Sequence, residues 1–275
     1  MKQSSFIRKV VNAPYILWSV LFIIAPLIMV IYYAFTNAEG DFTLENIAQI
    51  GDYTSTFILS IGYGAVATVL CLVIAYPFAY FLAQSKASFQ RVAVMLVMLP
   101  MWMSFLIRTY SWLTILGESG VINRFLAVFG VEPLRLLNTG GAVILGMVYN
   151  FLPYMILPLY TIMSKMDVSL VEAAEDLGCN RLHCLRKVIF PLSVPGIASG
   201  VTMVFVPSVS TFYITQKLGG GQITLIGDVI EGQFQTAYNY NLGAALSLVL
   251  MVMIIICLGV LNYFTDSDDD GGVLI

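Results

Sequence analysis

Charged residues are scarce in this chain. Only 11% of its 275 residues are Asp, Glu, Lys or Arg, whereas 59% are hydrophobic. A soluble domain typically carries about 25% charged residues. So few charges cannot cover a water-facing surface, which indicates that lipid is the solvent for much of the chain. The formal net charge of -3 also excludes a basic surface for nucleic acid.

Several motifs of catalysis and nucleotide binding are missing from the sequence. The single histidine excludes an H-E-x-x-H protease site, and no G-x-x-x-x-G-K-[ST] phosphate loop occurs. The cysteines are few and scattered. Cys179, His183 and Cys184 lie together, but three candidate ligands at this spacing match no zinc signature. We therefore predict no metal site and no catalytic residue.

Long apolar runs make up most of the chain. Six of them reach the roughly 20 residues that a membrane helix needs, namely residues 15–36, 57–84, 92–116, 141–164, 194–215 and 242–264. Because hydrocarbon leaves no partner for free backbone groups, runs of this length form helices. The sequence predicts an all-α polytopic protein with six transmembrane helices in one domain, residues 1–265. The acidic end, residues 266–275, is predicted to be disordered.

The distribution of Lys and Arg predicts the orientation of these helices. With the N-terminus in the cytoplasm, most bases fall on the cytoplasmic side: Lys2, Arg8, Lys9, Lys86, Arg91, Lys165, Arg181, Arg186 and Lys187. The outer side holds Arg124, Arg135 and Lys217. We therefore expect both termini to be cytoplasmic, in a bacterial plasma membrane.

Five of the six predicted spans contain proline: Pro26, Pro77, Pro100, Pro153 with Pro158, and Pro207. A proline frees a carbonyl and bends a membrane helix. Such bends are common in membrane proteins, and they are also suited to a bundle that opens and closes. Proline alone does not distinguish these alternatives.

A charged segment, EAAEDLGCNRLHCLRKVIFP, separates the predicted fourth and fifth spans. Ser169 and Glu172 have the spacing of a capping box, which predicts a helix that begins at Ser169. Gly178 suits the left-handed end of that helix. Asn180 can cap a second short helix, which Pro191 is expected to stop.

The two predicted helices of this cytoplasmic loop, residues 165–193, carry opposite charges. The first has Glu172, Glu175 and Asp176 on its polar face, and the second has Arg181, Arg186 and Lys187. An amphipathic pair that lies on lipid headgroups is one interpretation. Acids are not attracted to an anionic leaflet, however, so an acidic helix followed by a basic helix favours a docking site for another protein.

The loop resembles the EAA loop of the membrane subunits of bacterial ATP-binding-cassette (ABC) importers. That pattern is E-A-A, three residues, G, nine residues, then I-x-L-P. Here Val188 and Phe190 replace Ile and Leu and keep apolar character. The resemblance implies that the loop couples the chain to a separate ATPase through these residues: Glu172, Ala173, Ala174, Gly178, Arg181, Arg186 and Pro191.

Other blocks resemble the spermidine/putrescine permeases of this family. They include AYPFAYFLA (75–83), LPMWMSFLIRTYSWLTILGESGVIN (99–123), VYNFLPYMILPLYTIM (148–163) and LIGDVIEGQF (225–234). The resemblance implies a type I ABC importer permease that provides half of a translocation path and catalyses no reaction itself. ATP and Mg would bind to the partner ATPase, and no cofactor to this chain. The implied partners are a second homologous permease subunit, a dimer of ATPase subunits, an extracytoplasmic polyamine-binding protein and membrane lipid.

A polyamine path would need carboxylates for ammonium groups and aromatic faces for cation–π contacts. Asp228 and Glu231 lie three residues apart and would share a helix face. We hypothesise that they help to receive the cation, with an ordinary solvated loop as the alternative. The aromatic candidates are Trp102, Tyr110, Tyr149, Tyr154 and Tyr213. A membrane-interface belt would also be rich in Trp and Tyr.

Arg108 lies well inside the third apolar run, where a charge is costly and usually functional or paired. A cation there repels a polycation, so we predict a structural or gating pair with a carboxylate or a freed carbonyl. Snorkelling toward the outer surface is the alternative. Two other functions stay open for the whole chain. One is a related importer permease for iron, thiamine or phosphonate, and the other is a stand-alone secondary transporter.

Overall fold

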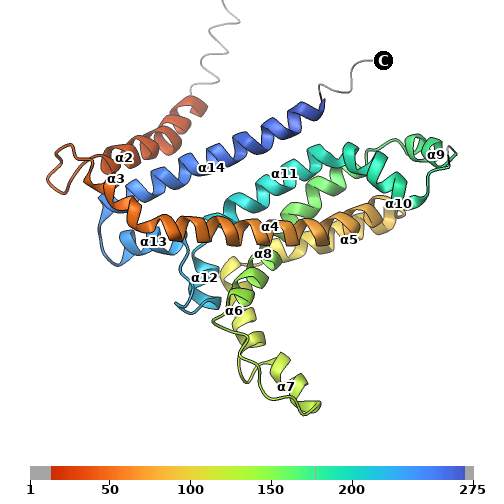
Figure 1. Cartoon of the computed structure of the whole chain (residues 1–275), viewed down its shortest axis with the longest axis horizontal. Helices are drawn as coiled ribbons and strands as arrows, with labels where there is room; N and C mark the ends of the chain where they lie inside the picture. The colour runs from red at the N-terminus through yellow and green to blue at the C-terminus, as the bar shows by residue number, and fades with distance from the viewer. Residues whose placement is uncertain (1–13, 177, 270–275) are drawn as a thin grey trace, which may run out of the picture. The chain divides into compact units, whose positions relative to one another are not determined.

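The computed structural model describes residues 14–176 and 178–269, and every long element within them is a helix (Figure 1). The only β-type pairing in these residues is an isolated bridge between Thr36 and Phe42. The chain divides into two compact units. One combines the residues up to Ser55 with Val229–Met253, and the other combines Thr56–Asp228 with the residues from Ile254 onward.

The helices have the following bounds in chain order. A helix from Pro14 to Ala34 includes a π-helical turn, Val20–Ile24, and α2, Ala25–Ala34. It is followed by α3 (Glu45–Gln49), a 3₁₀ turn (Ile50–Tyr53), α4 (Thr54–Ala83), α5 (Ala87–Trp102), α6 (Phe105–Leu116), α7 (Val121–Val128) and α8 (Gly140–Met163). Then come α9 (Val168–Asp176), α10 (Arg181–Cys184), a π-helical turn (Leu185–Ile189), α11 (Phe190–Val209), α12 (Tyr213–Leu218), α13 (Ile226–Gln235) and α14 (Tyr240–Asp269).

Five helices of the described chain are long and apolar enough to cross a membrane, and they overlap the first, second, fourth, fifth and sixth predicted spans. They are Pro14–Ala34, Glu45–Ala83, Gly140–Met163, Leu185–Val209 and Tyr240–Val260. A bent pair of helices supplies a sixth if it is counted as one span. The prediction of an all-helical polytopic protein is therefore confirmed. The orientation of the termini stays a prediction, and Lys2, Arg8 and Lys9 lie outside the described residues.

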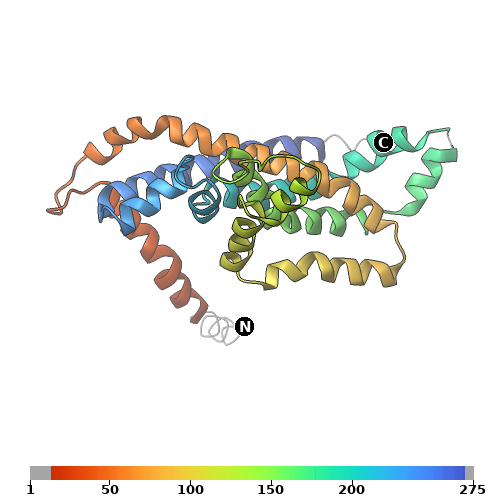
Figure 2. The same ribbon diagram turned by 90° about the horizontal axis from the view of Figure 1, so that it is seen from below.

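The third predicted span, residues 92–116, is wrong as a single straight helix. It is divided between α5 and α6, with a bend of 91° across the break (Figure 2). Met103 and Ser104 adopt extended ψ angles of 147° and 131°. Pro100 has no amide hydrogen to bond back into α5, so the last turn of α5 is weakened just where the chain leaves the helix.

The fifth and sixth predicted spans have different ends in the structure. The fifth, residues 194–215, begins earlier and stops at Val209, after which Tyr213–Leu218 forms the separate helix α12. The last helix, α14, continues to Asp269 and so includes the first residues of the tail predicted to be disordered. No Gly or Pro occurs between Thr265 and Asp269 to end it. Residues 270–275 lie outside the described residues.

In the first unit, the side-chain amides of two asparagines, one buried and one half-buried, bond carbonyls at and just after the end of α2. The Nδ2 group of Asn46 donates to the carbonyl oxygens of Ala34 and Thr36, at 3.2 and 2.9 Å. Asn241 donates to the Thr36 carbonyl as well, at 2.7 Å. The last carbonyls of a helix have no partner within it. These two asparagines therefore provide partners for carbonyls that the helix itself leaves without one.

In the second unit, α8 is the central helix. On α4, the buried small residues Ala67, Cys71, Ala75 and Ala79 recur every four positions and belong to the same core cluster as α8. The thiol of Cys71 lies 3.8 Å from the carbonyl oxygen of Val148 on α8. Small residues at this spacing let membrane helices approach closely, because van der Waals packing replaces the hydrophobic effect there.

The start of α13 packs closely against the turn between α11 and α12. A Cβ atom added at Gly227 would lie 2.5 Å from the Thr211 carbonyl oxygen and 2.6 Å from that of Ser210. The amide of Ile226 donates to the hydroxyl of Ser60 on α4, at 2.8 Å. Because the close neighbours of Gly227 are backbone atoms, only glycine fits this position without a shift of the chain.

We predict that Gly227→Ala lowers the stability of the purified protein by about 1–3 kcal/mol, the usual cost of overpacking. The added methyl group must displace the backbone at Ser210 and Thr211. Gly232→Ala on the same helix is the matched control, because no atom lies within 4 Å of its added Cβ. Thermal unfolding in detergent measures both midpoints. Equal midpoints for the two variants would contradict the close packing at Gly227.

Candidate functional site

The predicted coupling loop, residues 165–193, is a helix, a turn and a second helix. The first helix, α9, begins at Val168 rather than at Ser169, so the predicted capping box is wrong. Asp167 caps it instead, because its Oδ1 accepts a hydrogen bond from the Ser169 amide at 3.0 Å. This bond stabilises the carboxylate and lowers the pKa of Asp167 below its usual range. An acid directly before a helix competes well with a serine for the capping position.

The turn at Gly178 has the predicted conformation. Its φ angle is 86°, in the left-handed region that glycine adopts without strain. The amide of Cys179 donates to the carbonyl of Ala174, at 3.1 Å, which closes the end of α9. The side chain of Asn180 accepts a hydrogen bond from the His183 amide at 2.8 Å and caps α10, as predicted. Gly178 thus sets the bend between the two helices.

Pro191 does not stop the second helix. The chain stays helical from α10 through the π-helical turn Leu185–Ile189 into α11, with Pro191 in the first turn of α11. The amide of Phe190 donates to the carbonyl of Leu185, five residues earlier. This wider turn accommodates a proline, which cannot donate to the carbonyl four residues earlier and would clash with it. The coupling loop therefore continues into a membrane-spanning helix without a break.

The predicted coupling residues are mostly accessible. Glu172, Ala173 and Gly178 are exposed, Ala174 is half-buried, and Arg186 and Pro191 are exposed. Arg181 begins α10, but its side chain lies outside the described parts. Exposed small residues beside an acid on α9 can contact a protein groove without steric hindrance. The use of these residues as a dock stays a prediction.

Cys184 is buried, Cys179 is half-buried and His183 is exposed. Across residues 14–176 and 178–269, no group of three or more His, Cys, Asp or Glu side chains is placed to hold a metal.

Two of the predicted aromatic residues meet at the contact of α6 and α12. The rings of Tyr110 and Tyr213 lie 6.4 Å apart, centroid to centroid, at an angle of 71°. Phe105 is 5.9 Å from Tyr213. The Nζ atom of Lys217 lies 5.6 Å from the Tyr110 centroid and 5.7 Å from that of Tyr213. We call these two tyrosines with Lys217 the tyrosine–ammonium cluster.

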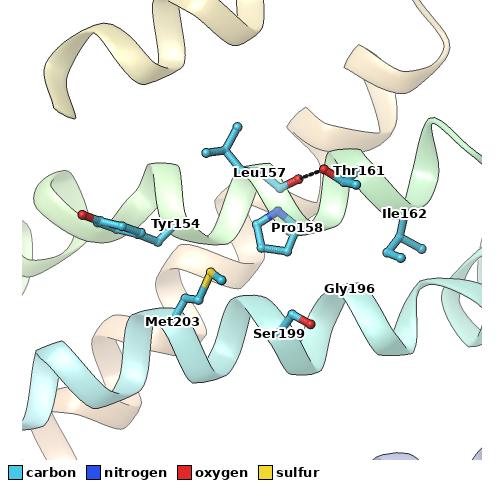
Figure 3. Close-up of a pocket in the computed structure, with 8 residues that line it drawn as sticks. All are labelled: Tyr154, Leu157, Pro158, Thr161, Ile162, Gly196, Ser199 and Met203. Carbon is cyan, nitrogen blue, oxygen red and sulfur yellow. Dashed lines mark hydrogen bonds between the residues drawn. The ribbon is translucent and has the colours of Figure 1, made fainter. Parts of the chain in front are cut away.

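The other predicted aromatic residues lie elsewhere in the second unit. Trp102 is 71% exposed at the end of α5. Tyr149 packs edge-on against Trp112, with centroids 5.4 Å apart. Tyr154 lies at one end of a groove of about 410 Å³ between α8 and α11 (Figure 3). Gly196 and Pro158 lie on opposite sides of this groove (Figure 3). The structure therefore does not gather all five aromatic candidates around one position.

Asp228 fastens α12 to the start of α13. Its Oδ1 accepts a hydrogen bond from the Thr215 hydroxyl at 3.0 Å, and its Oδ2 accepts one from the Leu225 amide at 2.8 Å. Asp228 and Glu231 both lie on α13 and both are half-buried. The bonds of Asp228 give it a positioning role for the helix that carries Tyr213 and Lys217. Direct contact of either carboxylate with a substrate stays a prediction.

Arg108 is only 8% exposed, on α6. Its guanidinium lies 5.8 Å from the Phe105 centroid. Its Nε and Nη1 atoms are buried and lack a hydrogen-bond partner among the residues that the structure describes. The predicted burial of this charge is thus observed, and its pairing stays a prediction.

Sequence reasoning missed Lys217, which it counted only as a base of the outer side. The signal was present, because Tyr213 and Lys217 lie four residues apart and therefore share one face of a helix. The contribution of Tyr110 from α6 is a tertiary contact that no local spacing reveals.

Comparisons with known proteins agree on one family. A family model described as "Binding-protein-dependent transport system inner membrane component" matches residues 74–267. The "Spermidine/putrescine transport system permease protein PotB" of Haemophilus influenzae is 36% identical over 256 residues, which cover 90% of this chain and 90% of that protein.

Two solved structures share the fold. One is a bacterial ABC transporter involved in the import of the acidic polysaccharide alginate, with a TM-score of 0.76, 17% identity and coverage of 96% of both chains. The other is the bacterial alginate ABC transporter in complex with an alginate pentasaccharide-bound periplasmic protein. It has a TM-score of 0.73, 16% identity and coverage of 96% of this chain and 95% of that one.

We predict that Thr215→Val and Asp228→Leu both lower the thermal midpoint of the protein, and that Asp228→Leu lowers it more because it also removes the acceptor of the Leu225 amide. Each removes the hydrogen bond between the Thr215 hydroxyl and the carboxylate, a contact with a charged group worth about 1.5–3 kcal/mol. The double variant should then be little worse than Asp228→Leu alone, which a double-mutant cycle of the midpoints tests. Fully additive losses would mean that the two residues act independently and would contradict the positioning role of Asp228.

Proposed function

Because this chain belongs to the family of binding-protein-dependent transport system inner membrane components, we propose that it is the membrane permease subunit of an ATP-driven polyamine importer. It is a multi-pass membrane protein, and a transporter subunit rather than a catalytic protein. The 36% identity to a spermidine/putrescine permease over 90% of the chain is the observation that carries the choice of substrate.

The proposed partners would supply the parts of an ATP-driven importer that this chain does not supply. It holds no phosphate loop, so a separate ATPase must hydrolyse ATP, and ATP with Mg would bind there. One such subunit forms half of a path, which calls for a second permease subunit. A binding protein would deliver the polyamine from outside. The complex of the alginate transporter with its periplasmic protein supports this last partner by analogy of fold.

The proposed coupling mechanism uses the continuity of the coupling loop with α11. The ATPase would contact the exposed face of α9 and the turn at Gly178. Since helix continues from α10 to Val209, a displacement of the loop by the ATPase would move α11 as well. α11 packs along α8, where Gly196 and Gly200 approach Pro158, Ile162 and Met155. A shift of α11 would therefore change the packing of the central helix.

The polyamine proposal is tested with the complete complex in proteoliposomes. The chain would be co-expressed with its partner ATPase, permease and binding protein, and ATP hydrolysis and uptake of labelled spermidine would be measured together. We expect spermidine on its binding protein to stimulate hydrolysis. Iron, thiamine and phosphonate compounds are the competing substrates, and stimulation by one of them instead would replace the polyamine assignment while leaving the transporter intact.

We predict that Gly178→Val uncouples hydrolysis from uptake, whereas Gly178→Asn retains most of the coupling. A β-branched residue at a φ angle of 86° is strained by about 1–3 kcal/mol. Asn tolerates the left-handed conformation, and no atom lies within 4 Å of a Cβ added here. Uptake per ATP hydrolysed is the quantity to compare. If Val is tolerated as well as Asn, the bend at Gly178 does not transmit the motion.

A further inference from the structure

The tyrosine–ammonium cluster presents two aromatic faces to one positive charge. Lys217 Nζ lies within 5.6 Å of the Tyr110 centroid and 5.7 Å of the Tyr213 centroid. Both distances fall within the roughly 6 Å over which a ring attracts a cation. The ammonium is thus shared by two rings that come from different helices, α6 and α12.

The cluster is accessible and held in position. Tyr110 is 51% exposed, and Tyr213 and Lys217 are half-buried. Lys217 follows Tyr213 by one helical turn on α12. Thr215, between them, is fully buried and bonded to Asp228. The rings are therefore oriented by the fold before any ligand arrives, which lowers the entropic cost of binding.

A cavity of about 450 Å³ adjoins the cluster. Tyr213 belongs to both the cluster and the cavity lining, and it contacts Phe105, which also lines the cavity. Its other walls are mainly apolar, from Leu106, Phe151, Pro207 and Phe212, and Ser210 and Thr211 complete the lining. A ligand with an ammonium group at the two tyrosines could therefore place a methylene chain against these walls.

We propose that Tyr110 and Tyr213 form a binding site for a primary ammonium group of the transported polyamine, and that Lys217 occupies this site until the substrate displaces it. This inference rests on the proposed function. Lys217 is then a tethered competitor, because its ammonium has the same charge and hydrogen-bonding capacity as the end of a polyamine. Two ammonium groups cannot occupy the same pair of ring faces, because two positive charges in contact repel each other.

The tethered ammonium has a consequence for selectivity. A cation that binds here must displace Lys217, so its own contact with the rings is offset by the lost contact of Lys217. A ligand with a single charge and no methylene chain therefore gains little binding free energy. A polyamine also gains contacts with the apolar cavity and can displace Lys217. The site thereby favours cations that carry an alkyl stem.

The displacement is tested by nuclear magnetic resonance on the complete importer complex. Reductive methylation with ¹³C-formaldehyde converts lysines to dimethyl-lysines, which keep the positive charge. The Lys217 signal is identified by its loss in Lys217→Arg. We expect the tyrosine ring currents to shift this signal away from that of the exposed Lys86. Saturating spermidine should move it to the position of an exposed lysine. A Lys217 signal that spermidine leaves in place overturns the proposal.

Uptake kinetics provide a second test that uses unmodified protein. We expect Lys217→Met to lower the half-saturating spermidine concentration by about 3- to 30-fold, as loss of a cation–π competitor predicts. Arg135→Met is the matched control, because it also removes one positive charge from the predicted outer side, at an exposed position away from the two tyrosines. Equal effects of the two variants would mean that general electrostatics explains the change, and would overturn the tethered competitor.

The rings themselves are tested by a conservative pair of substitutions in the Lys217→Met background, where no tethered ammonium competes for the same faces. Tyr213→Phe keeps an aromatic face and should retain spermidine uptake with little change in half-saturation. Tyr213→Leu keeps apolar volume but removes the face, and should raise half-saturation by about 3- to 30-fold. Equal behaviour of Phe and Leu would argue against a cation–π site.

The two readouts separate this inference from the proposed function. If spermidine is taken up but the Lys217 signal does not move, the polyamine importer stands and the site at the tyrosines falls. If the signal moves but no spermidine is taken up, the ammonium site stands and the assignment of polyamine transport falls. If neither responds, both are wrong.

Discussion

Hydrocarbon offers no hydrogen bonds to a backbone, and several irregularities of the described helices are arranged around that constraint. Where α2 ends, the amides of Asn46 and Asn241 take the carbonyls that water would otherwise bond. Where proline follows a helical segment, at Pro26 and at Pro191, a π-helical turn comes directly before it. In both turns an amide bonds five residues back, so the helix passes a proline without leaving the hydrogen-bonded form. The bend between α5 and α6 is the exception, and it lies next to the residues proposed to receive the substrate.

Features that depend on neighbours in the chain were predictable. Apolar runs predict helices because their length must match the bilayer. The left-handed turn at Gly178 and the cap at Asn180 are fixed by the chemistry of those single residues. The burial of Arg108 followed from its place inside an apolar run. The EAA pattern indicated an importer permease, because its residues and spacing are unusual in such an apolar chain, and the family match confirms that indication.

Features that depend on packing were not predictable in the same way. The choice of Asp167 over Ser169 as a cap is a competition between two suitable residues that lie two positions apart. Pro191 was expected to end a helix, since a proline pattern cannot show whether a π-helical turn will absorb it. The hydrogen bond between Asp228 and the Thr215 hydroxyl joins two helices and could not be read from the local sequence. The meeting of Tyr110 with Tyr213 and Lys217 likewise requires the bend after α5.

If a partner ATPase moves the coupling loop as proposed, the unbroken helix from Leu185 to Val209 would act as a mechanical lever. Its 25 residues span about 37 Å at the usual rise. A tilt of about 5° at the coupling end would carry the far end sideways by about 3 Å, half the height of a helical turn. The residues that leave the far end enter α12, which carries Tyr213 and Lys217. A sideways shift of that size would move a charge beyond the roughly 6 Å over which a ring attracts it. Motion driven by the ATPase could therefore release a bound ammonium, although no residue of the coupling loop touches the substrate.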